Sequence, residues 1–467
     1  MRKFHYFIIA AIVLCCTPLQ INAQNGCISE SMLTQIRNLQ AMTSADRALS
    51  NAIQENAIDL LALNHKNQTE LDTYFSINTK SQTITDQKSS GRCWLFSGLN
   101  ALRGNFAKKT DSLSVELSQA YVFFYDQLEK SNLFLQGIIE SANKPIDDPR
   151  VQFFFKSPIG DGGTFCGVAD LIEKYGIVPK AAMPESFSTD NTSRMRQLLC
   201  SKLREFGLQL RKMVANKAKT NYVATEKTKM LATVYHILSM SIGEPPMEFE
   251  FAFKTKNGQP LQTKKYTPKS FFQTIVGEKL NGNFIMAMND PRREYYKTYE
   301  VEYDRHTYDG HNWKYINLPM EDIEKMAIAA LKDNCKLYSS YDVAKFLDRK
   351  RGYADLNNYD YGSLFNTTFS MTKAERISTF DSGSTHAMTL TGVDIDENGM
   401  PKKWKVENSW GKDWGQKGCL IMTAQWFREY MFRLVVPNKY VPSDILKANS
   451  QTPTMVPPED PLFAVDE

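Results

Sequence analysis

The stretch DQKSSGRCWLFSGLN, residues 86–100, places a cysteine where a polar loop passes into an amphipathic run. A helix is predicted from Trp94 onward, because leucines recur at spacings of three and four residues. A helix N-terminus with Arg92 beside it would stabilise the thiolate of Cys93, which is the reactive form of a cysteine. The alternative is a buried cysteine that packs as a small hydrophobic residue. The rest of the chain has to decide between a nucleophile and a packing residue.

The N-terminus predicts export. Residues 1–23 hold Arg2 and Lys3, then a short apolar core, and end in the small residue Ala23, as a secretory signal peptide does. The apolar run is too short to cross a bilayer comfortably, so we predict a mature chain without a membrane span, periplasmic or extracellular. Lipidation of Cys27 is disfavoured because the residues before it are polar.

Composition and charge indicate an ordinary globular protein. The chain has 467 residues, 42% hydrophobic and 23% charged, which is long enough for two to four domains. A formal net charge of +4 is too mild to indicate nucleic acid as a main partner. Residues 194–219 carry eight lysines and arginines against one acidic residue. An anion or nucleic-acid surface is one interpretation, but a solvated helix face or a subunit contact is favoured for an exported protein.

The cysteines give no sign of a metal site. Two of the eight lie in the signal, and the rest are scattered without a C-x-x-C pair, which leaves zinc-finger and dithiol redox sites without support. We therefore predict neither a metal nor an organic cofactor. Export permits disulfides, and the sequence leaves their pairing open.

A base for the thiol is found near the C-terminal end. Residues 386–396 and 402–410 each alternate in period two around a turn, which predicts two adjacent strands. His386 begins the first strand, and Asn408 lies on the second, near the middle of the pair. An amide oxygen that accepts from one ring nitrogen would fix the tautomer and turn the other nitrogen toward the thiol. Trp410 could shield that hydrogen bond from water.

Acyl transfer to a thiol also needs donors for the oxyanion of its transition state. Gln87 precedes Cys93 closely, and its amide could form such a hole together with the backbone N–H of Cys93. A solvated loop glutamine is the alternative. A nucleophile, a base and an orienting amide in one chain indicate covalent catalysis by cysteine.

These motifs resemble the papain-like cysteine peptidases. DQKSSGRCWLFSGLN, STHAMTLTGV and VENSWGKDWGQKG are most similar to the bleomycin hydrolase and bacterial aminopeptidase C branch, and the similarity covers roughly residues 70–465. The resemblance implies an α+β, two-lobed papain-like fold with large helical insertions and a C-terminal arm. The expected parts are a signal peptide (1–23), an N-terminal helical extension (24–70), a helical lobe (71–190), a helical insertion for oligomerisation (191–375), a β lobe (376–440) and the arm (441–467).

The resemblance also implies roles for individual residues. Cys93 is the expected nucleophile, His386 the general acid and base, Asn408 its orienting partner and Gln87 the oxyanion donor. Gly162 and Gly163, in the motif DGG, match a place where the substrate backbone approaches closely, although a plain turn would also explain them.

The family further implies a homohexameric barrel with an arm lying in each cleft. The proline-rich segment from Val441 predicts an extended arm. Its terminal carboxylate, at Glu467, is expected to pair with the ammonium group of the substrate, in a tail slightly longer than is usual for the family.

We therefore expect an exported cysteine aminopeptidase that hydrolyses peptide substrates near free N-termini. An endopeptidase on the same fold is the nearest alternative, if the arm is removed or misplaced. A non-catalytic oligomeric scaffold is a further alternative, but it would have no use for a complete Gln–Cys–His–Asn set.

Overall fold

The computed structural model describes residues 26–110, 113–255 and 257–463. The predicted signal peptide and Glu467 lie outside the described residues. The chain divides into two compact units, Met1–Ala62 and Leu63–Glu467. The second unit thus begins inside the range 24–70 that we expected for the N-terminal extension. Among the described residues, no helix combines the length and apolarity that a bilayer crossing requires.

The first unit is helical, as its sequence predicts. Side-chain caps open its two longer helices: Ser29 accepts from a first-turn N–H, and Thr43 forms a capping box with Asp46. No side chain of these two helices is buried. The helices of this unit are α1 (Glu30–Leu39), α2 (Ser44–Glu55) and α3 (Ile58–Ala62).

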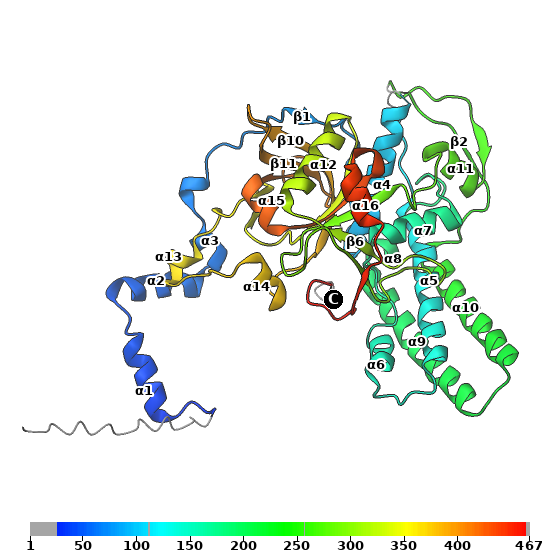
Figure 1. The fold of residues 1–467 in the computed structure, drawn as a ribbon, viewed down its shortest axis with the longest axis horizontal. Helices are drawn as coiled ribbons and strands as arrows, with labels where there is room; N and C mark the ends of the chain where they lie inside the picture. Colours follow the sequence, from blue (N-terminus) through cyan, green and yellow to red (C-terminus); the bar gives the residue numbers. More distant parts are fainter. Residues whose placement is uncertain (1–25, 111–112, 256, 464–467) are drawn as a thin grey trace, which may run out of the picture. The chain divides into compact units, whose positions relative to one another are not determined.

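The helical part of the second unit is built around α4, most of whose residues are buried. Figure 1 shows the long helices α5, α9 and α10 side by side, and α5 packs against both of the others. The helices of this part are α4 (Cys93–Lys109), α5 (Gln119–Glu140), α6 (Pro149–Lys156), α7 (Phe165–Tyr175), α8 (Phe187–Asp190), α9 (Thr192–Ala215), α10 (Thr220–Ile242) and α11 (Pro268–Ile275).

A mixed twelve-stranded sheet forms the rest, in the order β14-β5-β6-β4-β13-β7-β10-β11-β12-β9-β8, with β1 on β10. Its strands are β1 (Ile77–Asn78), β4 (Phe284–Met288), β5 (Thr298–Val301), β6 (Lys314–Asn317), β7 (Leu337–Tyr341), β8 (Leu347–Asp348), β9 (Tyr353–Ala354), β10 (His386–Ile395), β11 (Pro401–Glu407), β12 (Cys419–Thr423), β13 (Met431–Pro437) and β14 (Thr454–Val456). A separate hairpin joins β2 (Phe249–Phe251) to β3 (Lys264–Tyr266).

The sheet separates two hydrophobic cores. Along β10, Ala387 joins the core of the helical part, whereas Met388 and Leu390 join the core on the other face. This follows from the alternation of side chains along a strand. Helix α4 packs on β10 from one face, and α12 (Met320–Lys332) packs on it with the second core. The remaining helices are α13 (Tyr361–Phe365), α14 (Lys373–Ser378), α15 (Ala424–Tyr430) and α16 (Ser443–Asn449).

The expected helical insertion over 191–375 needs correction. Only its first part, α9 and α10, forms long helices, and the range then supplies β4, β6 and β7 to the central sheet. Strand β7 pairs with β10 and β13, so the β lobe begins well before residue 376. Strand β7 was not predicted from the sequence because it is buried along its whole length, and such a strand lacks the alternation of polar and apolar residues.

The expected extended arm over 441–467 also needs correction. It opens with the short helix α16, which directly follows Pro442, a position where proline does not disturb a helix. Beyond α16, β14 adds to the sheet edge beside β5, and the chain then turns between residues 458 and 463.

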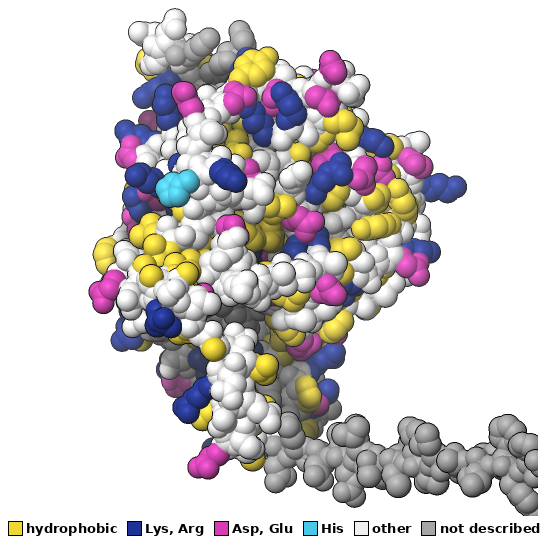
Figure 2. All heavy atoms as spheres, turned by 90° about the vertical axis from the view of Figure 1, so that its left-hand side faces the viewer, with side chains coloured by type: hydrophobic (Ala, Val, Ile, Leu, Met, Phe, Trp, Pro, Cys, Tyr) yellow, Lys and Arg dark blue, Asp and Glu magenta, His cyan; other side chains and the backbone are white. Residues whose placement is uncertain are grey.

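The basic stretch 194–219 lies largely on α9, and several of its cations have partners within the chain. Arg204 donates to the carbonyl oxygens of Phe155 and Lys156, and Arg211 donates to that of Ser141. This stretch is therefore explained by packing. On the face shown in Figure 2, basic and acidic side chains are interspersed.

Candidate active site

Cys93 is the first residue of α4, so its backbone N–H is one of those that a helix leaves without an intrahelical acceptor. The thiol lies against the sheet, because the backbone N–H of Ala387 points at Sγ over 3.4 Å. Ala387 follows His386 in β10. The contact therefore brings the start of α4 to the start of β10. No disulfide is formed by Cys93 or by any other cysteine in the described part of the chain.

Arg92 has a different role from the one expected. Its guanidinium is fully buried and donates to Glu185 Oε2 and to the carbonyl oxygen of Thr189, both at 2.8 Å. Glu185 compensates its charge. Arg92 thus anchors the loop before α4, and the helix N-terminus is left as the fixed positive influence on the thiol.

His386 and Asn408 form the hydrogen bond expected across the two strands. His386 Nε2 lies 2.8 Å from Asn408 Oδ1, and the backbone N–H of Ser409 donates to the same oxygen at 2.8 Å. Two donors on one atom identify it as the amide oxygen, so Nε2 carries a proton and Nδ1 is left to accept. Asn408 does not lie near the middle of the strand pair, because it directly follows β11. Since β10 and β11 are antiparallel, that end lies beside the start of β10.

Aromatic rings cover the imidazole. The ring of Trp410 lies 4.8 Å from that of His386, and Trp414 packs edge-on against Trp410. Burial lowers the pKa of His386 to about 4, with the hydrogen bond to Asn408 opposing this shift and the charge of Arg349 adding to it. The imidazole is therefore a neutral base at pH 7 unless a negative charge lies beside it. The Cys93 thiolate would supply that charge.

Gln87 is buried and fixed, not a solvated loop residue. Its amide donates to the carbonyl oxygen of Ser90, and Ser409 Oγ donates to its Oε1, both at 2.6 Å. Its backbone N–H donates to the carbonyl oxygen of Ser409. Gln87 is thereby attached to the residue after Asn408. The amide has a second N–H with which it can bind an oxyanion.

Gly162 and Gly163 line a cavity of about 1110 Å³. A Cβ on Gly163 would lie 2.2 Å from His306 Cε1 and 2.9 Å from Trp94 Cδ2, so only glycine fits there. Gly162 has open space where its Cβ would be. Gly163 thus lies against Trp94, the neighbour of Cys93, in a closer packing than a plain turn requires.

Asp161 is a residue that the sequence reasoning missed. Its carboxylate accepts from the backbone N–H of Gly91, and its carbonyl oxygen accepts from Trp94 Nε1, both at 2.8 Å. Asp161 therefore ties the glycine loop to both sides of Cys93. Its position beside the two glycines was a usable signal. Lys130, which donates to the carbonyl oxygen of Gly162 at 2.6 Å, gave none.

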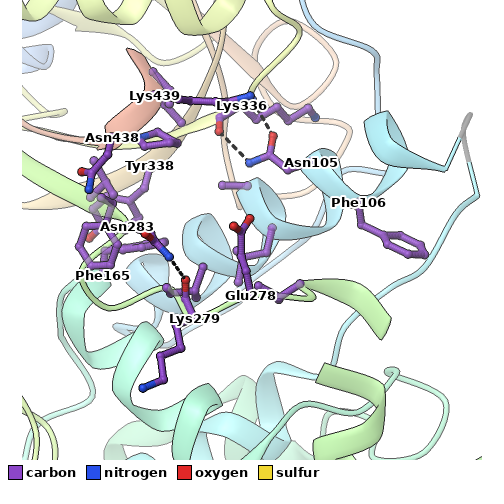
Figure 3. A pocket seen from close by; sticks show the side chains of 18 of the residues that line it. Asn105, Phe106, Phe165, Glu278, Lys279, Asn283, Lys336, Tyr338, Asn438 and Lys439 are labelled. Atoms are coloured by element: carbon purple, nitrogen blue, oxygen red, sulfur yellow. Dashed lines mark hydrogen bonds between the residues drawn. The ribbon is translucent and has the colours of Figure 1, made fainter. Parts of the chain in front are cut away.

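A second cavity, of about 260 Å³, lies at the far end of α4 (Figure 3). Asn105 and Phe106 line it together with Glu278 and Lys336. An α-helix rises about 1.5 Å per residue, so Asn105 is displaced by roughly 18 Å from Cys93 along the axis. This cavity is not part of the site around the thiol.

A family model, curated relatives and a solved structure all match most of this chain. Residues 28–463 match the model of the Peptidase C1-like family. Aminopeptidase C from Lactobacillus delbrueckii subsp. lactis is 36% identical over 89% of this chain and 93% of its own length. Human bleomycin hydrolase is 37% identical over 84% of this chain and 88% of its own. The crystal structure of PepW from Lactobacillus rhamnosis superposes with a TM-score of 0.89, at 36% identity over 94% of this chain and 99% of PepW.

The first prediction concerns the reactivity of the thiol. We expect alkylation of Cys93 by iodoacetamide to remain fast well below pH 7, because the helix N-terminus and a protonated His386 stabilise the thiolate. The rate is measured by mass spectrometry of the Cys93 peptide, with the exposed Cys27 as the internal reference.

Two variants separate the contributions to this rate. The hydrogen bond to Asn408 raises the pKa of His386, so Asn408→Ala lowers it further and should slow alkylation at pH 6 by about tenfold, a 1.4 kcal/mol effect. In His386→Ala the rate should rise only toward the ordinary thiol pKa of about 8.5. The same late rise in the unmodified protein would rule out the thiolate–imidazolium pair.

Proposed function

Because the chain belongs to the Peptidase C1-like family, we propose that its thiol–imidazole–amide site hydrolyses peptide bonds near free N-termini. The predicted family and the mixed α+β papain-like fold are confirmed, and the protein is a cysteine aminopeptidase of the bleomycin hydrolase and aminopeptidase C group. Two contacts carry the proposal. The Cys93 thiol lies against Ala387 of β10, and the neighbouring His386 is hydrogen-bonded to Asn408.

The geometry supports the following course. His386 Nδ1 takes the proton of Cys93, and the thiolate attacks the substrate carbonyl carbon. The backbone N–H of Cys93 and the second amide N–H of Gln87 bind the oxyanion. As the C–N bond breaks, His386 gives its proton to the leaving amine, which leaves a thioester on Cys93. His386 then takes a proton from water, whose oxygen attacks the thioester, and the thiol is restored.

The C-terminal arm supports the preference for N-termini. Its residues Pro458, Glu459 and Phe463 line the same cavity as Gly162 and Gly163. The turns of the arm there would occupy the space needed by substrate residues that precede the scissile bond. The arm would thus limit how many such residues can bind. Pairing of the Glu467 carboxylate with the substrate ammonium group remains a prediction.

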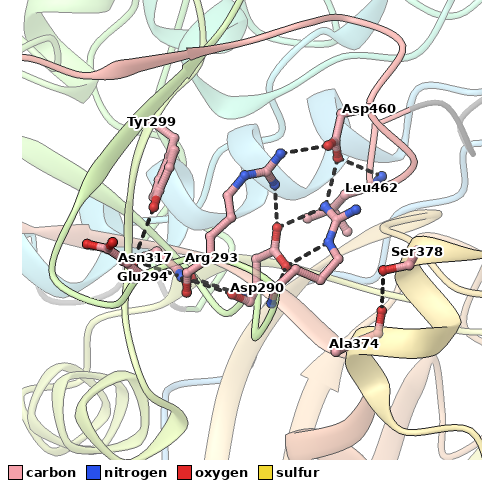
Figure 4. Close-up of polar contacts among 10 residues, drawn as sticks. Asp290, Arg293, Glu294, Tyr299, Asn317, Ala374, Ser378, Asp460 and Leu462 are labelled. Carbon is pink, nitrogen blue, oxygen red and sulfur yellow. Dashed lines mark hydrogen bonds and ion pairs between the residues drawn. The ribbon is translucent and has the colours of Figure 1, made fainter.

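An ion-pair cluster fixes the arm to the sheet (Figure 4). Asp460 accepts from Arg292 Nη2 at 2.8 Å and from Arg293 Nη2 at 2.6 Å, and Asp290 pairs with both arginines. Burial opposes ionisation of Asp460, but the two guanidinium groups prevail and hold its pKa below the usual value. The next turn is closed by Leu462, which is fully buried and donates its N–H to Asp460. The arm is therefore held in place at this point.

The function is tested with matched peptides whose N-termini are free or acetylated. We expect cleavage of the free peptide at least about tenfold faster, because the arm blocks longer chains. Cys93→Ala should reduce turnover by more than about a thousandfold with the fold intact, since nothing else supplies the nucleophile. Equal cleavage of both peptides would favour the endopeptidase alternative, and no cleavage of either would favour a scaffold.

The ion-pair cluster provides a test of the arm. In Arg292→Ala/Arg293→Ala, Asp460 loses both partners, and the carboxylate is left without a compensating charge. We expect the preference for free N-termini to fall by about tenfold and internal cleavage to appear, as in a chain truncated before Asp460. Arg194→Ala, an exposed arginine on α9, is the control. A truncated enzyme that keeps its preference would show that the arm is not the limit.

We also propose export and a homohexamer. Export rests on the sequence of residues 1–23, and the hexamer on the family resemblance. The expected mature N-terminus is Gln24. Intact mass and light scattering of the exported protein check both proposals. A retained N-terminal segment would contradict the first, and a monomeric mass the second.

A further inference from the structure

His306 is a buried histidine to which neither the sequence motifs nor the proposed mechanism assign a role. It follows β5 and lies between α4, α5 and the loop 160–164, with 2% of its surface exposed. Its Nδ1 lies 2.5 Å from Asp126 Oδ1, and its Nε2 lies 3.2 Å from the backbone nitrogen of Thr164. Its ring packs on that of Trp94 at 4.6 Å. The imidazole thus contacts the loop and the residue next to Cys93.

These two hydrogen bonds define the state of the ring. A backbone N–H can only donate, so Nε2 must be unprotonated, and Nδ1 carries the proton that is donated to Asp126. Any change that protonates Nε2 places two donors face to face at Thr164. The neutral Nδ1–H form is therefore the one that holds the loop.

The imidazole ring of His306 is closely packed against two glycines. A Cβ on Gly163 would lie 2.2 Å from its Cε1, and a Cβ on Gly167 would lie 2.1 Å from its Cδ2. Both glycines let the chain approach the imidazole, from the loop and from the first turn of α7. A shift of the ring would therefore move the backbone at Gly163.

The charged groups around His306 are Asp126, Asp304 and Lys130. Asp126 also binds Lys130 at 2.9 Å, and although burial opposes its ionisation, the charge of Lys130 and the hydrogen bond from His306 hold its pKa below the usual value. Asp304 lies on the histidine's own segment, and burial raises its pKa against the charges of Arg433 and Lys130. Lys130 reaches over to the carbonyl oxygens of Gly160 and Gly162. The same cluster thus holds both ends of the loop.

We propose that His306 is a positioning residue of the peptidase site, which holds Thr164 and Gly163 so that the loop presents its backbone to the substrate beside Cys93. The inference rests on the proposed function, because it assigns the loop to substrate binding. His306 itself does not touch the reacting atoms. Its effect should therefore be seen in the binding of peptides more than in the chemistry of the thiol.

Two isosteric variants test this inference. His306→Asn keeps a donor for Asp126 but has no acceptor that reaches Thr164, whereas His306→Gln keeps an acceptor near the position of Nε2. We expect kcat/KM for a free peptide to fall at least about tenfold in H306N, mainly through KM, and no more than about threefold in H306Q. Alkylation of Cys93 by iodoacetamide, which needs no substrate loop, should stay within about twofold in both variants.

The control is His311→Asn, which removes a largely exposed imidazole that pairs with Asp170 away from the loop. Equal losses in H306N and H306Q, or a parallel loss of alkylation, would overturn the inference. If H306N does not fold, Asp126→Asn replaces it, with the same rise in KM expected because the Nδ1–H form is no longer enforced. An unmodified enzyme that alkylates normally but cleaves no peptide would refute the proposed function itself, and the inference with it.

Discussion

The hydrogen bond between His386 Nε2 and Asn408 Oδ1 is the interaction on which the site depends. It can form only because β10 begins where β11 ends, in a register that pairs Thr389 with Glu407. A slip of one residue would turn Asn408 to the other face of the sheet. The same bond opposes the effect of burial on the imidazole. The pairing of two strands thus sets both the direction and the basicity of the expected base.

The second requirement is that the helical part of the chain, which carries the thiol, packs against the sheet, which carries this base. Cys93 belongs to the helical core and His386 to the sheet, and α4 packs directly on β10. Asp161 bonds to the chain on both sides of Cys93, at Gly91 and Trp94. The position of the nucleophile is therefore set by buried contacts from opposite directions. Little freedom remains for α4 to shift relative to the glycine loop.

The sequence allowed prediction of the residues that lie in short motifs, but not of the contacts that form only when distant segments pack together. Cys93 and Asn408 lie in short segments whose residue order already indicates their chemistry, and the hydrogen bond to His386 needs only adjacent strands. His306 contacts the glycine loop from 142 residues further along the chain than Thr164, so no spacing could reveal it. Strand β7 was hidden because it is buried throughout, and α16 because prolines at a helix start resemble those of an extended arm.

The cavity between the glycine loop and the arm is bounded by charge on both sides. Asp126 is shared by His306 and Lys130, and Asp460 is shared by two arginines. Buried ion pairs add little net stability compared with apolar packing, but they are strict about geometry. Apolar contacts alone would allow either wall to shift. Walls held by such pairs favour a cavity of constant length. A cavity of constant length accepts a fixed number of substrate residues before the scissile bond, as cleavage near a free N-terminus requires.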